Sequence, residues 1–288
     1  MRWLVTGACG KLGHDLVEEL LRSGEEVVGL GRDHLDITDP GGVRAACARY
    51  APDTVVNCAA YTDVDAAESR PDEAYRINAE GPRHLAEACA RTGARLLHVS
   101  TDYVFSGSDR SSPYQEDHPT SPCSVYGESK LEGEHAVLRA LPDRAAVLRT
   151  AWLYGAHGRS FVKTMLGIAA SGSGADVVDG QVGQPTWTRD LARRIVLVGR
   201  RPDANGILHA TNSGQATWFS LAAEVFLLAG ADPDRVRPCA DDLFPRAARR
   251  PAYSVLGQSR WAEFGAPPLR PWRAALREAL DEMSPPES

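Results

Sequence analysis

Short apolar runs and amphipathic segments alternate along the first half of the chain. Runs rich in valine and leucine recur at residues 2–6, 26–30, 54–59, 95–100 and 145–150. Runs of this length and composition are typical of strands that are buried on both faces, as in a parallel sheet. The pattern therefore predicts a parallel sheet built from the first 150 residues.

The segments between these runs have the apolar spacing of helices. Leucines recur at helical intervals between residues 12 and 21, and Gly24 is placed to end that helix. The Asp39-Pro40 pair is a helix start signal, and residues 71–92 form a longer helical stretch that Gly93 closes. Strand–helix–strand repetition with right-handed crossovers predicts an α/β fold with a Rossmann-type doubly wound parallel sheet.

The regular alternation of apolar runs and amphipathic segments ends after Thr150, where proline and glycine become frequent. Helical periodicity returns near residues 188–200, 217–230 and 271–283. We predict an NAD(P)-binding Rossmann domain at 1–155 and a smaller mixed α/β lobe, mostly substrate-binding, at 156–288. Part of 181–210 is expected to return to the first domain. The Pro-Pro-Glu-Ser ending predicts a disordered tail.

Composition and charge narrow the class of protein. The 288 residues are 43% hydrophobic and 24% charged, which is ordinary for a globular protein. A formal net charge of −6 favours neither nucleic acid nor an anionic membrane as the main partner. No run approaches the ~20 apolar residues that span a bilayer. Six scattered cysteines without a C-x-x-C pair favour reduced thiols. We therefore predict a cytoplasmic protein.

A glycine-rich loop follows the first predicted strand. Gly7, Gly10 and Gly13 give the spacing G-x-x-G-x-x-G, with Lys11 and Leu12 opening the next helix. Such glycines allow a tight turn, a close approach of the backbone to a pyrophosphate, and close packing of helix on strand. The helix N-terminus then offers free N–H groups to the phosphates. Glycines also occur in purely structural turns, but the position between strand and helix favours a dinucleotide site.

The end of the second predicted strand bears on the choice of coenzyme. A fold that selects NAD usually places an acid there, whereas this strand ends Gly-Leu-Gly-Arg at Arg32. Arg32 could bind a 2′-phosphate, or it could be a surface arginine. NADPH is therefore preferred over NADH. Asp36 and Ile37 are expected beside the adenine.

A tyrosine and a lysine four residues apart are the candidate catalytic pair. Tyr126 and Lys130 would share one face of a helix, and the ammonium would lower the pKa of the phenol toward the working pH. A phenol tuned in this way can give a proton to a developing alkoxide. Thr101 stands at the end of the fourth predicted strand, where parallel sheets bind ligands, and its hydroxyl can bind the substrate carbonyl. Ser100, beside it, is placed with the coenzyme.

Several further blocks complete a family pattern. They are Leu35–Asp39, Val56–Asp65, Ile77-Asn78, Ser100–Phe105, Val125–Lys130, Leu148–Gly155, Phe161–Met165, Gln184–Thr186 and Arg250–Leu256. Together with the glycine loop they resemble the dTDP-4-dehydrorhamnose reductases, in the extended branch of the short-chain dehydrogenase/reductase superfamily. The resemblance covers nearly the whole chain.

The resemblance implies reduction of the C4 ketone of a dTDP-4-keto-6-deoxyhexose by NAD(P)H. The catalytic set it implies is Thr101, Tyr126 and Lys130. The residues that it places around the sugar are Thr62, Val64, Asp102, Tyr103 and Trp152. It places Ala59, Ala60 and Tyr61 beside the coenzyme.

Two departures from the family pattern concern the site and the assembly. Tyr61 stands where histidine is common in such blocks, which could alter the nicotinamide or sugar environment. Some relatives dimerise around magnesium bound by glutamates, and the nearest counterparts here are the shorter Asp15 and Asp190. We therefore predict no metal, and a homodimer stays open.

Three alternatives compete with this function. A 4-ketoreductase for another nucleotide deoxysugar in secondary metabolism would use the same catalytic groups. An epimerase or dehydratase of the superfamily is disfavoured because Tyr103 stands where a second acid would be convenient. A regulatory subunit of the methionine adenosyltransferase type is built on the same pattern but need not keep the catalytic set, which is present here.

Overall fold

A six-stranded parallel sheet forms the centre of the computed structural model, which describes residues 1–108 and 112–283. The predicted tail lies outside these residues. The strand order is β10-β5-β4-β3-β1-β2, and every neighbouring pair is parallel. The strands are β1 (Arg2–Thr6), β2 (Glu26–Leu30), β3 (Thr54–Asn57), β4 (Arg95–Thr101), β5 (Ala145–Thr150) and β10 (Gly206–His209). This confirms the predicted fold class.

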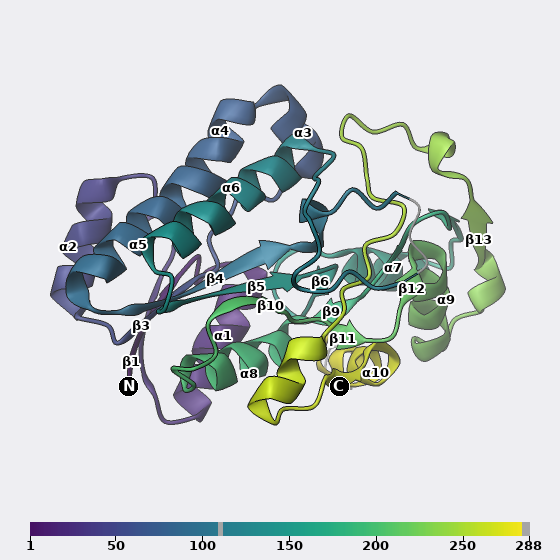
Figure 1. Cartoon of the computed structure of the whole chain (residues 1–288). Helices are drawn as coiled ribbons and strands as arrows, with labels where there is room; N and C mark the ends of the chain where they lie inside the picture. Colours follow the sequence, from purple (N-terminus) through teal and green to yellow (C-terminus); the bar gives the residue numbers. More distant parts are fainter. Residues whose placement is uncertain (109–111, 284–288) are drawn as a thin grey trace.

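Helices cover both faces of the sheet (Figure 1). On one face α1 (Lys11–Arg22) packs beside α8 (Thr188–Gly199), and their leucines and isoleucines share one core with Val5 and Leu97. On the other face lie α2 (Pro40–Tyr50), α5 (Gly81–Thr92) and α6 (Val125–Ala140), over a second core. This placement is the doubly wound arrangement, and it leaves the carboxyl ends of the strands open at one edge.

The long helical stretch predicted at 71–92 is interrupted in the structure. It consists of α4 (Pro71–Tyr75), a π-helical turn over Arg76–Glu80, and α5. The short helix α3 (Val64–Ser69) precedes it. A π-helical turn widens a helix locally and is frequent at functional sites. This one turns Arg76 and Asn78 toward the carboxyl edge of the sheet, as the next section shows.

A third hydrophobic core lies in the second half of the chain, among α7, α9 and α10. Small two-stranded sheets surround it, and Figure 1 shows these elements grouped at one end of the molecule. The helices are α7 (Phe161–Ala170), α9 (Trp218–Leu228) and α10 (Trp272–Met283). The short strands are β6 (Leu153–Tyr154), β7 (Ala175–Val178), β8 (Val182–Gly183), β9 (Thr186–Trp187), β11 (Asn212–Ser213), β12 (Ala216–Thr217), β13 (Val236–Cys239) and β14 (Leu269–Pro271).

The second half of the chain also contributes to the central sheet. Strand β10 pairs with β5, and α8 packs on α1. The division into domains at 1–155 and 156–288 stays a prediction. In the part of the chain that the structure describes, no helix is both long enough and apolar enough to cross a bilayer.

Candidate active site

Two adjoining cavities lie along the carboxyl edge of the sheet. The first, which we call the coenzyme cavity, has a volume of about 360 Å³ and lies over the ends of β1, β2 and β3. The second, the reaction cavity, has a volume of about 530 Å³ and reaches to β4, β5 and α6. Gly10, Cys58 and Ala60 line both, so one extended ligand could occupy the two.

The glycine loop forms the floor between the cavities. Gly7 has a φ of +67°, and a Cβ there would lie 2.6 Å from the backbone nitrogen of Ala59. A Cβ on Gly13 would lie 2.2 Å from the Gly7 carbonyl oxygen, so α1 starts directly against the loop. Gly10 precedes α1 and supplies no side chain to cap it. The first N–H groups of α1 therefore remain available for phosphate oxygens.

Arginine side chains lie at the far end of the coenzyme cavity. Arg32 lines it together with Asp36 and Ile37, as predicted, and also with Arg76, which the sequence analysis did not single out. The Asp36 carboxylate accepts from the backbone and the hydroxyl of Thr38, which lowers its pKa, and Arg76 donates to the same hydroxyl at 3.3 Å. Two guanidinium groups in one cavity fit a phosphate-bearing ribose better than a bare one.

Thr101, Tyr126 and Lys130 all line the reaction cavity. Thr101 is buried at the end of β4 and donates to Asp102 Oδ1 at 3.1 Å. Lys130, on α6, is buried and donates to the Val99 carbonyl oxygen at 2.7 Å, and burial lowers its pKa to about 8. The helical spacing on α6 brings Tyr126 and Lys130 to the cavity that Thr101 reaches from the end of β4.

The expected lowering of the Tyr126 pKa is wrong for this structure. Burial raises the pKa of Tyr126 to about 12, and the Asp102 charge acts in the same direction. A hydrogen bond with Thr101 opposes these effects. A neighbouring lysine charge would favour the phenolate, but desolvation, which disfavours it, is the larger effect here. The phenol therefore holds its proton firmly.

Asp102 and Tyr103 continue the wall of the reaction cavity. Asp102 is 2% exposed, and burial raises its pKa to about 6. Hydrogen bonds from Ser254 and Thr101 lower the same pKa but are outweighed by burial. Burial also raises the pKa of Tyr103. The Tyr103 and Tyr126 rings meet edge to face, with centroids 5.5 Å apart. These contacts give Tyr126 a fixed wall on its substrate side.

Close packing fixes the first turn of α6. Ser124 caps the helix by accepting from the Gly127 N–H at 3.2 Å. A Cβ on Gly127 would lie 2.3 Å from the Tyr103 carbonyl oxygen, so only glycine lets α6 approach this segment so closely. Asn78 in the π-helical turn bonds the Tyr61 backbone on one side and Ser129 Oγ on the other. Asn78 therefore connects the end of β3 to the helix that carries Tyr126.

Two stacked tryptophans close the reaction cavity from the second half of the chain. Trp152, after β5, and Trp218, on α9, stack with centroids 3.6 Å apart and planes within 7°. Trp152 has a φ of +46°, a strained conformation for a non-glycine residue. Strain of this kind persists where packing over-determines the backbone, and it clusters at functional sites.

A third cavity, of about 340 Å³, continues beyond these tryptophans. Tyr103 and Trp218 line it as well as the reaction cavity, and Arg246 and Arg250 bring positive charge to it. Arg250 donates to both carboxylate oxygens of Asp65, at 2.6 and 2.7 Å, and the pKa of Asp65 falls to about 2. Neither arginine was assigned to the site from the sequence, although Arg250 opens one of the family blocks, because both lie more than 100 residues from Tyr126 along the chain.

Most of the predicted site residues therefore line the coenzyme cavity or the reaction cavity at the carboxyl edge of the sheet. Two do not line either of the first two cavities: Gly13 acts through packing, and Tyr61 is held by its backbone. Those of the coenzyme cavity are Gly7, Gly10, Arg32, Asp36, Ile37, Ala59 and Ala60. Those of the reaction cavity are Gly10, Lys11, Leu12, Ala60, Thr62, Val64, Ser100, Thr101, Asp102, Tyr103, Tyr126, Lys130 and Trp152.

Comparison with known proteins agrees with this geometry. The family model described as the RmlD substrate binding domain matches residues 1–284. The chain belongs to the RmlD family. This RmlD-family chain is 59% identical over 286 residues to a probable dTDP-4,6-dihydroxy-2-methyloxan-3-one 4-ketoreductase from Streptomyces antibioticus, with coverage of 98% and 96% of the two chains. It is 56% identical to a dTDP-4-dehydrorhamnose reductase from Streptomyces griseus, with coverage of 98% and 94%.

A solved structure extends the match to three dimensions. It is a dTDP-4-dehydrorhamnose reductase from Bacillus anthracis in complex with NADP, with a TM-score of 0.93, 37% identity, and coverage of 98% and 99%. The resemblance predicted for this RmlD-family chain is thus confirmed, together with an NAD(P)-dependent oxidoreductase fold.

Proposed function

We propose that the chain reduces the C4 ketone of a dTDP-4-keto-6-deoxyhexose with NADPH or NADH, and that NADPH is preferred. The observation that carries this proposal is the meeting of Thr101, Tyr126 and Lys130 in one cavity that adjoins the glycine-loop cavity. The protein acts in the cytoplasm. Light scattering on the purified chain distinguishes a monomer from a homodimer.

The residues of the reaction cavity supply the proton and the polar contacts. NADPH, when bound, supplies a hydride to the ketone carbon. Tyr126 donates its phenolic proton to the C4 oxygen as charge develops there. Its high pKa keeps it protonated at neutral pH, so it enters the reaction as the acid. Thr101 is placed to donate a hydrogen bond to the same oxygen.

Lys130 and Asp102 set the electrostatics around that proton. Lys130 lies one helical turn beyond Tyr126, and below pH 8 it keeps most of its positive charge, which favours the phenolate left after proton transfer. Asp102 titrates at about 6, so above that pH its negative charge holds the phenol protonated before transfer. Lys130 would thus favour the phenolate after proton transfer, whereas Asp102 favours the protonated phenol before it.

The third cavity is the proposed place for the nucleotide end of the substrate. Arg246 and Arg250 would pair with the diphosphate, because guanidinium groups match phosphate oxygens in geometry and charge. The side of the stacked Trp152–Trp218 pair that lines the reaction cavity would pack against the sugar. A hexose bound between these arginines and Tyr126 would then lie beside the phenol.

Two ketosugars distinguish the leading function from its nearest alternative, which the Streptomyces antibioticus relative favours. Oxidation of NADPH is followed with dTDP-4-dehydrorhamnose and with a dTDP-4-keto sugar deoxygenated at C2, and NMR assigns the C4 configuration of each product. Turnover of either ketosugar supports a 4-ketoreductase. The ratio of the two kcat/KM values shows which of the two sugars is the preferred substrate. Coenzyme binding with no turnover of any ketosugar would instead support a regulatory subunit.

The arginines of the coenzyme cavity give a separate prediction. We expect Arg32→Ala to raise the KM for NADPH about 10-fold and the KM for NADH less than about 2-fold, because only NADPH offers a phosphate for a charge-assisted hydrogen bond. Arg76→Ala should act in the same direction, since Arg76 lines the same cavity. Steady-state kinetics with both coenzymes measures this. Arg91→Ala, on the exposed side of α5, is the control, and equal effects on both coenzymes would remove the role of Arg32.

A further inference from the structure

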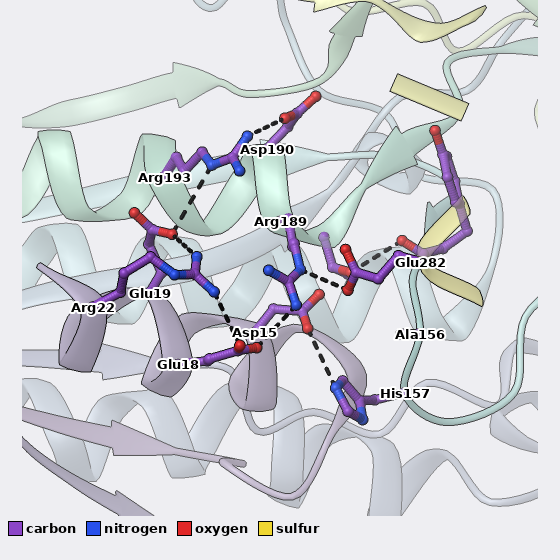
Figure 2. Close-up of polar contacts among 12 residues, drawn as sticks. Asp15, Glu18, Glu19, Arg22, Ala156, His157, Arg189, Asp190, Arg193 and Glu282 are labelled. Carbon is purple, nitrogen blue, oxygen red and sulfur yellow. Dashed lines mark hydrogen bonds and ion pairs between the residues drawn. The ribbon is translucent and has the colours of Figure 1, made fainter. Parts of the chain in front are cut away.

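A second cluster of polar side chains lies outside the three cavities. His14, Asp15 and Glu18 come from α1, and His157 comes from the segment after β6. One ligand-type atom from each lies within 4.8 Å of the others. Figure 2 shows the Asp15 carboxylate directed toward the His157 ring, with Glu18 on the same face of α1. The proposed reductase activity uses none of these side chains.

Asp15 is the central member of the cluster. It is 2% exposed, yet neither carboxylate oxygen has a hydrogen-bond partner among residues 1–108 and 112–283. The His157 Nε2 atom lies 3.7 Å from Asp15 Oδ1, beyond hydrogen-bond distance. A buried carboxylate without a partner is costly, so this position calls for a bound cation.

The two histidines limit which cation would fit. Their rings lie with centroids 3.5 Å apart and planes 31° apart, and His14 is exposed at the surface. Rings this close can both present a nitrogen to one ion. Two imidazole nitrogens and a carboxylate oxygen suit zinc and related transition metals, and magnesium prefers oxygen ligands alone.

We propose that His14, Asp15 and His157 bind a zinc ion or a similar divalent transition metal. Tetrahedral zinc with ligands at about 2.1 Å places them about 3.4 Å apart. The cluster must therefore contract slightly, and the exposed His14 side chain is free to do so. A fourth position remains for water, as in zinc sites with three protein ligands.

Glu18 lies beside the proposed ligands and is already paired. Its two oxygens accept from Arg22 at 2.9 Å and from Arg189 at 3.1 Å. We therefore assign it to the surroundings of the ion, where it adds negative charge and can accept a hydrogen bond from a metal-bound water. Arg189 is tied in turn to Glu282, at 2.7 Å, which fixes this edge of the site (Figure 2).

Asp190 does not belong to this site. It accepts from Arg270 Nε at 2.8 Å and from Asn212 Nδ2 at 2.8 Å, so its oxygens are directed to those partners. Some relatives bind magnesium through glutamates whose nearest counterparts here are Asp15 and Asp190. The proposed zinc site differs from that arrangement in both its ligands and its metal. The nitrogen ligands come from residues 14 and 157 of a single chain.

Metal binding would also hold in place a segment that lines the reaction cavity. His157 is followed by Gly158 and Arg159, and both line that cavity. The Lys163 ammonium donates to the Ala156 carbonyl oxygen, so the segment is already held on its other side. An ion on His157 would fix the segment from within, and it would do so without contact with substrate.

Titration of the tag-free, EDTA-treated chain tests the proposal. We expect one equivalent of zinc by calorimetry, and Co²⁺ visible absorption typical of a four- or five-coordinate site with nitrogen ligands. His14→Ala and His157→Ala should each weaken zinc binding by about 100-fold or more, because loss of a ligand exceeds the 10- to 100-fold cost of losing an outer contact. The control is His135→Ala, an exposed histidine of α6 that lies 3.7 Å from Glu132.

Folding of each variant is checked by NADPH binding and circular dichroism, and Asp15→Asn serves as a further variant that keeps the side-chain volume. Loss of zinc binding in these three variants, with binding kept in His135→Ala, supports the site. Three results would overturn it: no saturable zinc binding, binding unaffected by the His14 and His157 substitutions, or magnesium binding as tight as zinc binding. None depends on turnover, so the test is independent of the proposed reductase activity.

Discussion

Tyr126→Phe is expected to lower kcat by about 100- to 10,000-fold, the range that a positioned general acid contributes. The phenol lies in the reaction cavity with its pKa raised to about 12, and the phenyl ring would keep its edge-to-face contact with Tyr103. The substitution therefore removes the proton and little else. Stopped-flow or steady-state oxidation of NADPH with a dTDP-4-keto sugar measures the loss.

Tyr50→Phe is the matched control, because it removes a hydroxyl from a half-buried tyrosine at the end of α2, away from the cavities. We expect its kcat to stay within about 2-fold of the wild type. Both variants should bind NADPH normally by fluorescence. A Tyr126→Phe variant that keeps wild-type turnover would show that another group, or water, supplies the proton.

Local patterns in the sequence were sufficient for five of the six strands of the central sheet and for the glycine loop, whereas β10 was not predicted as a strand. Buried strands such as 95–100 are continuous apolar runs, and the loop glycines have fixed spacing, so both are visible without tertiary contacts. The same holds for Tyr126 and Lys130, because one helix sets their relation. Where a function depends on a few neighbouring residues, the sequence carries it directly.

The site roles that the sequence did not reveal depend on contacts between distant segments, although Asn78 and Arg250 both lie in the family blocks. Arg76 and Asn78 reach the site through a π-helical turn, which apolar periodicity does not reveal. Trp218 and Arg250 come from far along the chain, and only packing of the second half brings them to Tyr103. The raised pKa of Tyr126 is also a tertiary effect, because desolvation depends on every neighbour at once.

A buried ion pair shows the same dependence and links α6 to the sheet. Arg149 on β5 and Glu134 on α6 are 2% and 1% exposed. They bond through Arg149 Nε and Nη2, at 3.0 and 2.7 Å, and Ser100 also donates to the Glu134 carboxylate. Since α6 carries Tyr126 and Lys130, this pair anchors the catalytic helix against β4 and β5.

Glu134→Ala is therefore expected to lower the free energy of unfolding by about 3–5 kcal/mol, because it leaves the Arg149 guanidinium buried without a counter-charge. Urea unfolding of the coenzyme-free chain measures the change. Glu132→Ala on the same helix is the matched control. Glu132 pairs with Arg139 at the surface, where both side chains are about half exposed or more, so its loss should cost about 1 kcal/mol or less.

The double variant Glu134→Leu with Arg149→Met separates charge from packing. If the cost of Glu134→Ala comes from the unpaired guanidinium, replacing both partners by apolar side chains of similar size should recover most of the lost stability, because apolar replacement of a buried pair is often neutral or better. If the double variant is as unstable as Glu134→Ala, the cost lies in packing around α6. Equal, small losses for the Glu134 and Glu132 variants would show that the pair does not anchor the helix at all.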